Sequence, residues 1–293
     1  MKNNCVIRNS VAVLILFMVL FQGCYQAVQG CLDAQATNYS VDADEPCPDD
    51  CCTYPSIKLK IQHCYEVAPD SFISLNYGDS IYYDALGEPF RISGIQYYMS
   101  AFKLVKTDGS LIGVSDSLTV DQIDPLSGDT SALTLEDNFL LLNPVLKEVN
   151  ITLGNFREVA TFSGIQFQLG LDVPANFTNP ASVEDNHPLS IQADNMYISP
   201  EEGYIFHKVG LFADTLATDT IPVITEIRGL SNLRDVILPI VFTTNNGFDV
   251  TISIQVNYKR WFEGIDIQNS LNNDLEQQLI ANIPSSFSVI DVN

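Results

Sequence analysis

The chain has 293 residues, with 36 acidic against 14 basic side chains and a formal net charge of −22. This balance excludes nucleic acid as a partner, because neutralising phosphates requires clusters of lysine and arginine. An acidic surface instead suits solubility outside the cell or contact with divalent cations.

The N-terminus has the features of an export segment. Basic Lys2 and Arg8 precede an apolar run at residues 11–21, which is shorter than the roughly 20 residues of a membrane-spanning helix. Gly23 directly precedes Cys24, as at a lipoprotein processing site. We therefore expect residues 1–23 to be a signal peptide and Cys24 to carry a lipid anchor. The expected location is the cell envelope, as an outer-membrane or cell-surface lipoprotein that meets the membrane through its anchor only, and ordinary secretion is the alternative.

Residues 24–56 form a predicted small module and linker that precede the main domain. In an exported chain the default for its cysteines Cys31, Cys47, Cys51 and Cys52 is disulfide pairing. Three connectivities are open, and the adjacent Cys51 and Cys52 are each expected to pair outward. A zinc or copper thiolate site is the alternative that oxidising conditions disfavour.

This module is similar to the short Cys/Asp-rich segments of secreted proteins from bacteria of the Bacteroidetes type, whose pattern is roughly GC-x-D-x-x-A-x-NY ending in C-x-Y. The resemblance implies a stapled spacer, and its aspartates are suited to calcium, the less favoured cofactor. The matching residues are Gly30, Cys31, Asp33, Ala36, Asn38, Tyr39, Cys52 and Tyr54.

The rest of the chain predicts strands with no helices between them. Apolar and polar residues alternate in the way of half-buried strands, and no β-α-β order appears. The fold class is therefore all-β, an antiparallel β-sandwich with elaborated loops. The predicted strands span residues 57–65, 149–153, 160–171, 203–213 and 222–228.

Two hairpins and one helix complete the expected elements. A hairpin over residues 90–112 turns at Asp108 and Gly109, and a second over residues 234–262 turns at Asn246 and Gly247. Both dipeptides favour tight turns. A short helix is expected at residues 274–281, near the C-terminus.

Catalysis finds no support in the sequence, so we expect the protein not to be an enzyme. There is no nucleophile elbow of the G-x-S-x-G type and no phosphate-binding glycine loop. His63 and Cys64 are neighbours on a predicted strand, and such neighbours point to opposite faces, so they are not expected to form a catalytic pair.

Metal binding is the remaining chemistry. By the two-residue period, His63 shares the inner face of its strand with Ile61. His187 lies in a polar loop, and His207 lies in an alternating strand, where we expect it at the surface or rim. If the loop folds back on that strand, His187, Met196 and His207 would face one another. Imidazole with thioether is a ligand set that copper prefers.

Residues 57 to about 265 resemble the MbnP-like family, copper-associated β-sandwich proteins related to the CorA proteins of methanotrophs. The matching stretches are IKLKIQHCY, YYDALGEPFRISGIQYYMSAFKL, TFSGIQFQLGLDVPANFTN, NHPLS, MYISPEEGYIFHKVG and KRWF, in the family order. The resemblance identifies residues 57–293 as the family domain.

The resemblance implies copper binding outside the inner membrane, with His63 and His187 at the positions of family histidines. Some members carry a tryptophan that a partner dihaem enzyme, a peroxidase-like protein, oxidises to kynurenine. Here Ile198 and Pro200 replace the two signature tryptophans, and Trp261 lies in the closing strand.

The expected function is therefore non-catalytic copper binding, with His63 and His187 as the main ligands and Met196 and His207 as peripheral ones. A metal-free structural or interaction module is the alternative. A calcium-stabilised surface protein is the third class, since residues 117–129 and the small module are rich in aspartate.

Overall fold

The computed structural model describes residues 26–114, 116–145, 148–191, 195–213, 215, 221–270 and 274–293. The expected signal peptide and the lipid-anchor residue Cys24 lie outside these residues. The chain divides into two compact units, a small one that ends at Thr53 and a large one over Tyr54–Asn293. Among the described helices, none is long and apolar enough to cross a membrane.

The small unit is held by covalent bonds more than by a core. Its strands β1 (Gln29–Gly30) and β2 (Glu45–Pro46) form one short parallel pair. Disulfides join Cys31 to Cys52 and Cys47 to Cys51, which confirms the expected pairing and selects one of the three connectivities.

Removing the longer disulfide is expected to unfold the small unit. Cys31 and Cys52 are 21 residues apart in sequence, and closing a loop of that length stabilises a fold by about 3 kcal/mol. The double variant Cys31→Ser with Cys52→Ser should lose protease resistance between residues 26 and 53. Cys47→Ser with Cys51→Ser is the matched control, because that pair is separated by only 4 residues. Equal resistance of both variants would contradict the prediction.

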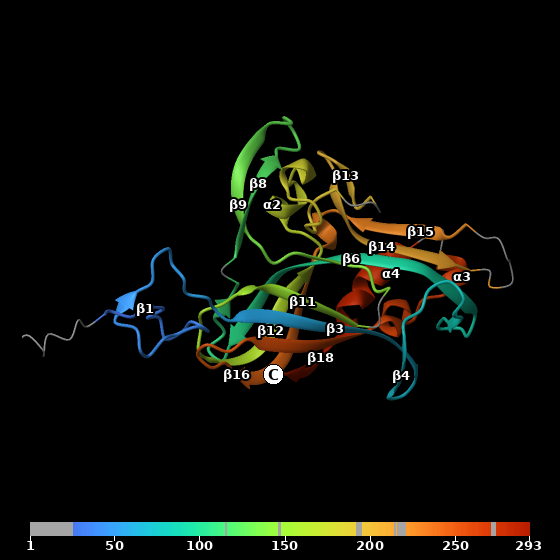
Figure 1. The fold of residues 1–293 in the computed structure, drawn as a ribbon. Helices are drawn as coiled ribbons and strands as arrows, with labels where there is room; N and C mark the ends of the chain where they lie inside the picture. The colour runs from blue at the N-terminus through green and yellow to red at the C-terminus, as the bar shows by residue number, and fades with distance from the viewer. Residues whose placement is uncertain are drawn as a thin grey trace, which may run out of the picture. The chain divides into compact units, whose positions relative to one another are not determined.

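The large unit is a two-sheet sandwich, as the alternation predicted (Figure 1). Residues from both sheets share one hydrophobic core, for example Leu59 and Ile254 from one sheet and Leu104 and Phe167 from the other. The nine-stranded sheet has the main order β13-β14-β6-β12-β16, and the five-stranded sheet has the order β11-β3-β17-β18. Among the described strands of these two sheets, all pairings are antiparallel except the parallel pair β3 and β17.

The strands of the large unit are β3 (Ser56–Ala68), β4 (Ser71–Ser74), β5 (Tyr82–Tyr83), β6 (Pro89–Lys106), β7 (Leu111–Ile112), β8 (Ser117–Ile123), β9 (Thr130–Glu136), β10 (Leu140–Leu142), β11 (Glu148–Asn155), β12 (Thr161–Leu169), β13 (Tyr197–Ser199), β14 (Gly203–Phe212), β15 (Val223–Arg228), β16 (Arg234–Thr243), β17 (Val250–Asn257) and β18 (Phe287–Val292). The helical segments are α2 (Val173–Asn176), η1 (Pro180–Ser182), η2 (Leu230–Asn232), η3 (Tyr258–Phe262), α3 (Ile267–Ser270), α4 (Leu275–Asn282) and η4 (Ile283–Ser286).

Most of the expected elements are confirmed. The first hairpin exists as β6 and β7, with Gly109 in the left-handed conformation at φ +85°. The C-terminal helix is α4. The aspartate-rich stretch at residues 117–129 begins with strand β8, which pairs with β9.

The second predicted hairpin is wrong. Residues 246 and 247 do form a turn, and Gly247 has φ +76°. However, β16 pairs with β12 in one sheet, and β17 pairs with β3 and β18 in the other. The turn therefore carries the chain across the core from sheet to sheet, because both strands offer an apolar face that the facing sheet covers.

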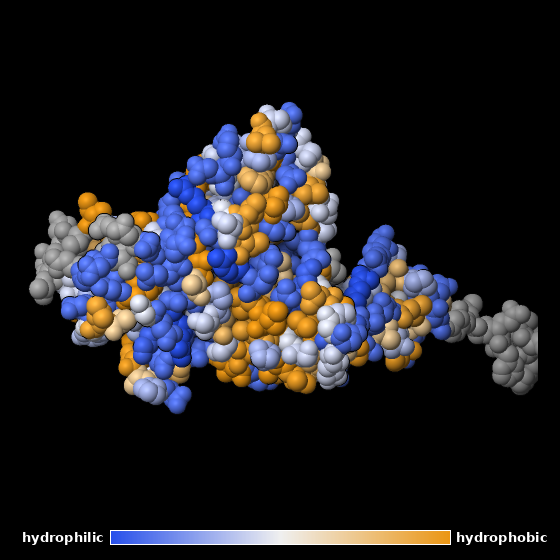
Figure 2. Space-filling view, turned by 180° about the vertical axis from the view of Figure 1, so that it is seen from behind, coloured by the Kyte–Doolittle hydropathy of each residue, from blue (hydrophilic) through white to orange (hydrophobic). Residues whose placement is uncertain are grey.

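Strand β16 lies at the edge of the nine-stranded sheet. Ile237 and Val241 point outward there, with 63% and 72% of their surfaces exposed. Figure 2, which views the molecule from behind Figure 1, shows hydrophobic residues gathered over the lower middle of the large unit. Pro239 lies between the two side chains and lacks an N–H, so it limits pairing of this edge with another strand.

Candidate metal site

His63 lies on the inner face of β3, as the two-residue period predicted. Ile57, Leu59 and Ile61 precede it on the same face with no exposed surface, and His63 itself is 1% exposed. Its neighbour Cys64 is also buried, its Sγ lies 3.4 Å from the carbonyl of Val256, and burial raises its pKa to about 11. Cys64 is therefore a neutral thiol.

A hydrogen bond fixes the His63 ring at one nitrogen only. Nδ1 lies 2.9 Å from the hydroxyl of Tyr258, which in turn lies 3.2 Å from the hydroxyl of Tyr97. Nε2 is buried and has no partner. Burial lowers the pKa of His63 to about 4, so the ring is neutral at pH 7. When Nδ1 donates its proton to Tyr258, Nε2 keeps a lone pair that nothing in the described fold uses.

His207 is buried, which corrects the expectation that it lies at the surface or rim. It is 2% exposed, and neither of its ring nitrogens has a hydrogen-bond partner among the residues that the structure describes. Burial, followed by the charge of Arg234, lowers its pKa to about 3. The alternation of β14 misled here because both faces of the strand are buried. Val209 and Leu211 pack in the main core, and Tyr204 and Phe206 pack in a second hydrophobic cluster.

His63 and His207 each contact members of one connected group of aromatic rings. Tyr97 is stacked on His207 at 6.0 Å between centroids, and the edge of Trp261 meets His207 at the same distance. Tyr258 lies 5.1 Å from Trp261 and 5.8 Å from His63. We name these five residues, His63, Tyr97, His207, Tyr258 and Trp261, the ring cluster.

The short helix η3 explains how one segment supplies two members of the ring cluster. In a 3-10 helix, residues three apart lie on the same side, so Tyr258 and Trp261 both face the core. Asn257 begins this helix by accepting a hydrogen bond from the N–H of Lys259. Burial raises the pKa of Tyr97 and of Tyr258 above the ordinary value, so the ring cluster carries no charge at pH 7.

Replacing Tyr258 by Phe should weaken the fold and free the second nitrogen of His63. The hydroxyl of Tyr258 links His63 to Tyr97, and losing buried partners costs about 1–3 kcal/mol. Urea unfolding would measure this loss. Tyr97→Phe is the matched control, since it leaves the contact between His63 and Tyr258 intact and should cost less. A cost for Tyr258→Phe no larger than that of Tyr97→Phe would contradict the expectation.

His187 lies in a different place, in the loop before β13. Its Nδ1 accepts a hydrogen bond from the N–H of Leu189 at 3.1 Å, and its Nε2 lies 3.0 Å from a carboxylate oxygen of Asp137. Because an accepting Nδ1 bears no proton, Nε2 must carry one and donate it to Asp137. Both ring nitrogens are therefore engaged in this arrangement.

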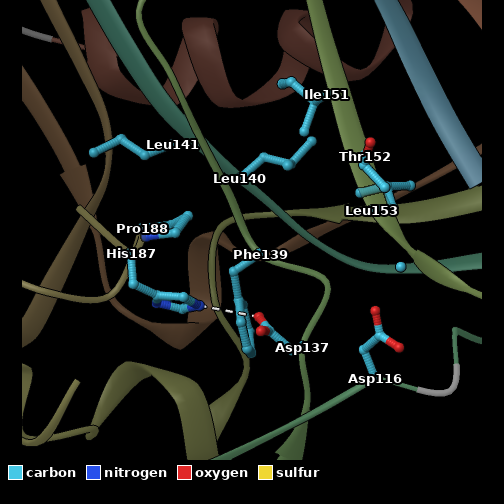
Figure 3. A pocket seen from close by; sticks show the side chains of 11 residues that line it. Asp116, Asp137, Phe139, Leu140, Leu141, Ile151, Thr152, Leu153, His187 and Pro188 are labelled. Carbon is cyan, nitrogen blue, oxygen red and sulfur yellow. Dashed lines mark hydrogen bonds and ion pairs between the residues drawn. The ribbon is translucent and has the colours of Figure 1, made fainter. Parts of the chain in front are cut away.

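His187 and Asp137 line a cavity of about 390 Å³. Figure 3 shows their hydrogen bond at one wall, with Asp116 on the same side and apolar side chains opposite. The edge of Phe139 contacts the imidazole at 6.2 Å between centroids. The cavity thus combines a polar end with an apolar wall formed by Leu140, Leu141, Ile151 and Leu153.

Met196 is fully buried, and the loop that holds it does fold back on β14. The carbonyl of Met196 accepts a hydrogen bond from the N–H of Ile205 at 2.7 Å. Its side chain packs in a second hydrophobic cluster with Phe206. The rings that contact His207, those of Tyr97 and Trp261, belong to the main core, so Met196 and His207 have different neighbours.

The structure therefore divides the four expected ligands into two groups. His63 and His207 belong to the ring cluster, whereas Met196 lies in the second hydrophobic cluster, against which Phe139, the neighbour of His187, also packs. Within the described part of the chain, no three His, Cys, Asp or Glu side chains form a group that could hold a metal ion.

Sequence reasoning missed Asp137, Tyr97 and Tyr258. Tyr258 is 195 residues from its partner His63, and Asp137 is 50 residues from His187. The tyrosine pair at 97 and 98 and the aromatic run YKRWF were visible signals, but aromatic runs in strands usually serve only packing.

The family model for MbnP matches residues 54–279. This chain belongs to the MbnP family. MbnP from Methylosinus trichosporium is a solved structure to which the chain is similar, with 12% sequence identity, 71% of this chain and 78% of that chain covered, and a TM-score of 0.39. A search of curated proteins finds no match.

The sequence resemblance assigns the two signature tryptophan positions to Ile198 and Pro200. Ile198, at one signature position, lies in β13 and packs against the second hydrophobic cluster. Pro200 follows this strand directly. Trp261, the one tryptophan of the chain, belongs to the ring cluster and has no exposed surface.

Proposed function

We propose that this MbnP family member is an exported protein that binds copper without catalysing a reaction. The observation that carries the proposal is the buried imidazole of His63, whose Nε2 has no partner while Nδ1 is oriented by Tyr258. Histidines that ligate metals characteristically donate their other ring N–H to an oxygen atom, which fixes the tautomer. An unpaired nitrogen in the core otherwise only costs stability.

His187 is the second proposed ligand, and its surroundings fit the same chemistry. The carboxylate of Asp137 accepts the Nε2 proton, so Nδ1 is the nitrogen with a lone pair. That nitrogen now accepts the N–H of Leu189, which a metal would have to displace. Copper accepts imidazole readily, and bound there it would supply a redox-active cation. Met196 and His207 remain proposed peripheral ligands.

The proposed cellular setting rests on the first residues of the chain. The basic start, the apolar run at 11–21 and the Gly23-Cys24 step together support export with a lipid at Cys24. We propose the cell envelope as the location. The family tryptophan chemistry is not proposed at residues 198 and 200, because isoleucine and proline cannot yield kynurenine.

Copper content of the purified protein tests the proposal. The mature chain, loaded with copper and freed of excess metal, should retain stoichiometric copper by elemental analysis. His63→Ala with His187→Ala should retain none, and each single variant should retain less than the parent protein. Far-UV circular dichroism would show that the variants fold. Full copper retention by the folded double variant would overturn the ligand assignment.

The alternative is a structural or interaction module that keeps the sandwich without the metal. The engagement of both His187 nitrogens favours it. It predicts no retained copper in the parent protein. A calcium-dependent rise in melting temperature without a copper effect would favour the calcium class.

A further inference from the structure

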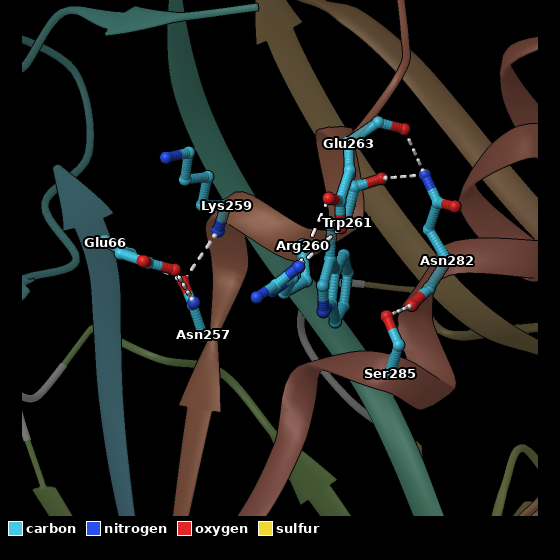
Figure 4. Close-up of polar contacts among 8 residues, drawn as sticks. All are labelled: Glu66, Asn257, Lys259, Arg260, Trp261, Glu263, Asn282 and Ser285. Carbon is cyan, nitrogen blue, oxygen red and sulfur yellow. Dashed lines mark hydrogen bonds and ion pairs between the residues drawn. The ribbon is translucent and has the colours of Figure 1, made fainter. Parts of the chain in front are cut away.

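A second cavity, of about 280 Å³, lies at the far end of β3 beside β5 and η3. This size is near the lower bound of small-molecule sites. Figure 4 shows polar contacts of this region, among them those of Glu66 on β3, of Asn257 at the end of β17 and of Arg260 in η3. The lining that matters here is Tyr65, Glu66, Tyr83, Lys259, Arg260 and Phe262.

The 3-10 geometry of η3 divides its side chains between the core and this cavity. Tyr258 and Trp261 face the ring cluster, while Lys259 and Phe262, also three residues apart, both line the cavity. The cavity therefore receives one cation and one aromatic ring from the same side of the helix.

The apolar side of the cavity is an ordered series of rings. Tyr65 lies 4.2 Å from Tyr82 between centroids, and Phe90 lies 6.0 Å from Tyr82 and 5.0 Å from Phe262. Tyr65 and Phe262 belong to the lining, and the other two rings lie behind them. Flat apolar ligands stack well on such a surface.

The remaining wall is fixed by Asp84. One oxygen of its carboxylate accepts the N–H groups of Leu86 and Glu88, both at 2.9 Å, and the other accepts the N–H of Ile267 at 3.0 Å. These bonds hold the turn after β5 against the segment that follows η3. The Asp84 carboxylate therefore binds three backbone N–H groups and holds this wall in place.

Most of the charged side chains that line the cavity have a partner within the described part of the fold, and Lys259 does not. Glu263 is bound by Arg260 at 2.9 Å, and Glu66 accepts a hydrogen bond from Asn257 at 2.9 Å. Among the lysines and arginines that the structure describes, Lys259 alone has no carboxylate, carbonyl or ring partner for its charged group. The partnered ones are Lys58, Lys60, Arg91, Lys103, Lys106, Arg157, Lys208, Arg228, Arg234 and Arg260.

Lys259 is exposed, so its ammonium is available to a ligand that enters the cavity. We propose that this cavity binds a small carboxylate with an aromatic body. The carboxylate pairs with Lys259, and the ring lies against Tyr65 and Phe262. Charge-assisted hydrogen bonds are the strong ones in a partly enclosed site. The site is separate from the proposed copper ligands, so it stands without them.

Calorimetric titration with phenylacetate tests this assignment in the full mature chain. Binding should be saturable, and phenethylamine, which has a similar body and the opposite charge, should bind far more weakly. Lys259→Met should weaken phenylacetate binding by about tenfold, the typical worth of one charge-assisted hydrogen bond, and Lys259→Arg should keep most of the affinity.

Lys60→Met is the matched control, because Lys60 lies on β3, the strand that supplies Tyr65, but pairs with Glu148 at 3.1 Å. It should leave phenylacetate binding unchanged. Absence of saturable binding, equal affinity for phenethylamine, or equal affinity of the parent and Lys259→Met would each overturn the proposal. The titration does not measure copper. A negative result would therefore leave the proposed copper function untouched.

Discussion

Lowering the pH from about 7.5 to about 4.5 should remove roughly 5 kcal/mol from the free energy of unfolding of the metal-free protein, through two histidines alone. The pKa of His63 falls from 6.5 to about 4 in the fold, and that of His207 falls from 6.5 to about 3. Neither ring can take a proton in the core without losing solvation, so the unfolded chain takes up protons first.

The direction follows from proton linkage. Between the unfolded pKa and the folded pKa, the unfolded state binds more protons, so stability decreases as the pH falls. The contribution is complete above about pH 6.5 and is lost progressively down to about pH 3 to 4. By this relation, about 2.5 kcal/mol of stability per ring has been lost at pH 4.5. Carboxylate groups add a further pH dependence.

Urea unfolding followed by the fluorescence of Trp261, the chain's one tryptophan, measures this effect. His207→Phe should lose about half of the histidine part of the pH dependence and should be no less stable than the parent at pH 7.5. His187→Gln is the control, since His187 already has partners for both nitrogens. An unchanged slope for His207→Phe would show that the core imidazole is protonated without cost.

The fold class could be predicted because most strands have one covered face. In β3 the inner residues Ile57 and Ile61 alternate with Lys58 and Lys60, and that period also placed His63 correctly. In β14 the same reasoning failed for His207. Both faces of this strand are buried, so neither set of alternating side chains is exposed to solvent.

The position of a turn could be predicted from the sequence, but the partners of the strands that flank it could not. Asn246 and Gly247 do make a turn, yet the dipeptide describes a local stretch of backbone and not the sheet that each flanking strand joins. Here β17 pairs in parallel with β3, which lies far earlier in the chain. Long-range pairing is decided by which apolar faces are left to cover, and that is a property of the whole fold.

The candidate site depended on partners far away in sequence. The histidines could be identified as residues, but the orientation of His63 is set by Tyr258 and that of His187 by Asp137. No spacing rule connects these pairs. The structure also supplies what composition could not, namely that Nε2 of His63 and both nitrogens of His207 have no partner among the described residues.

Trp261→Ala should be the most damaging single substitution in the ring cluster. Trp261 has no exposed surface, contacts Tyr97, His207 and Tyr258, and donates its Nε1–H to the hydroxyl of Ser286 at 3.0 Å. Removing a buried tryptophan leaves a cavity and costs about 3–5 kcal/mol.

Far-UV circular dichroism during urea unfolding would measure this loss, because the variant has no indole to follow. Trp261→Phe should cost less, since it keeps a ring among the same neighbours and Ser286 still donates to the carbonyl of Ile283 at 2.7 Å. Ser286→Ala measures the contribution of the hydrogen bond by itself. It leaves the indole N–H unsatisfied, at a cost of about 1–3 kcal/mol. If Trp261→Ala cost no more than Ser286→Ala, the indole would contribute only its hydrogen bond, and the ring cluster would not be the packed centre that holds His63 and His207 in place.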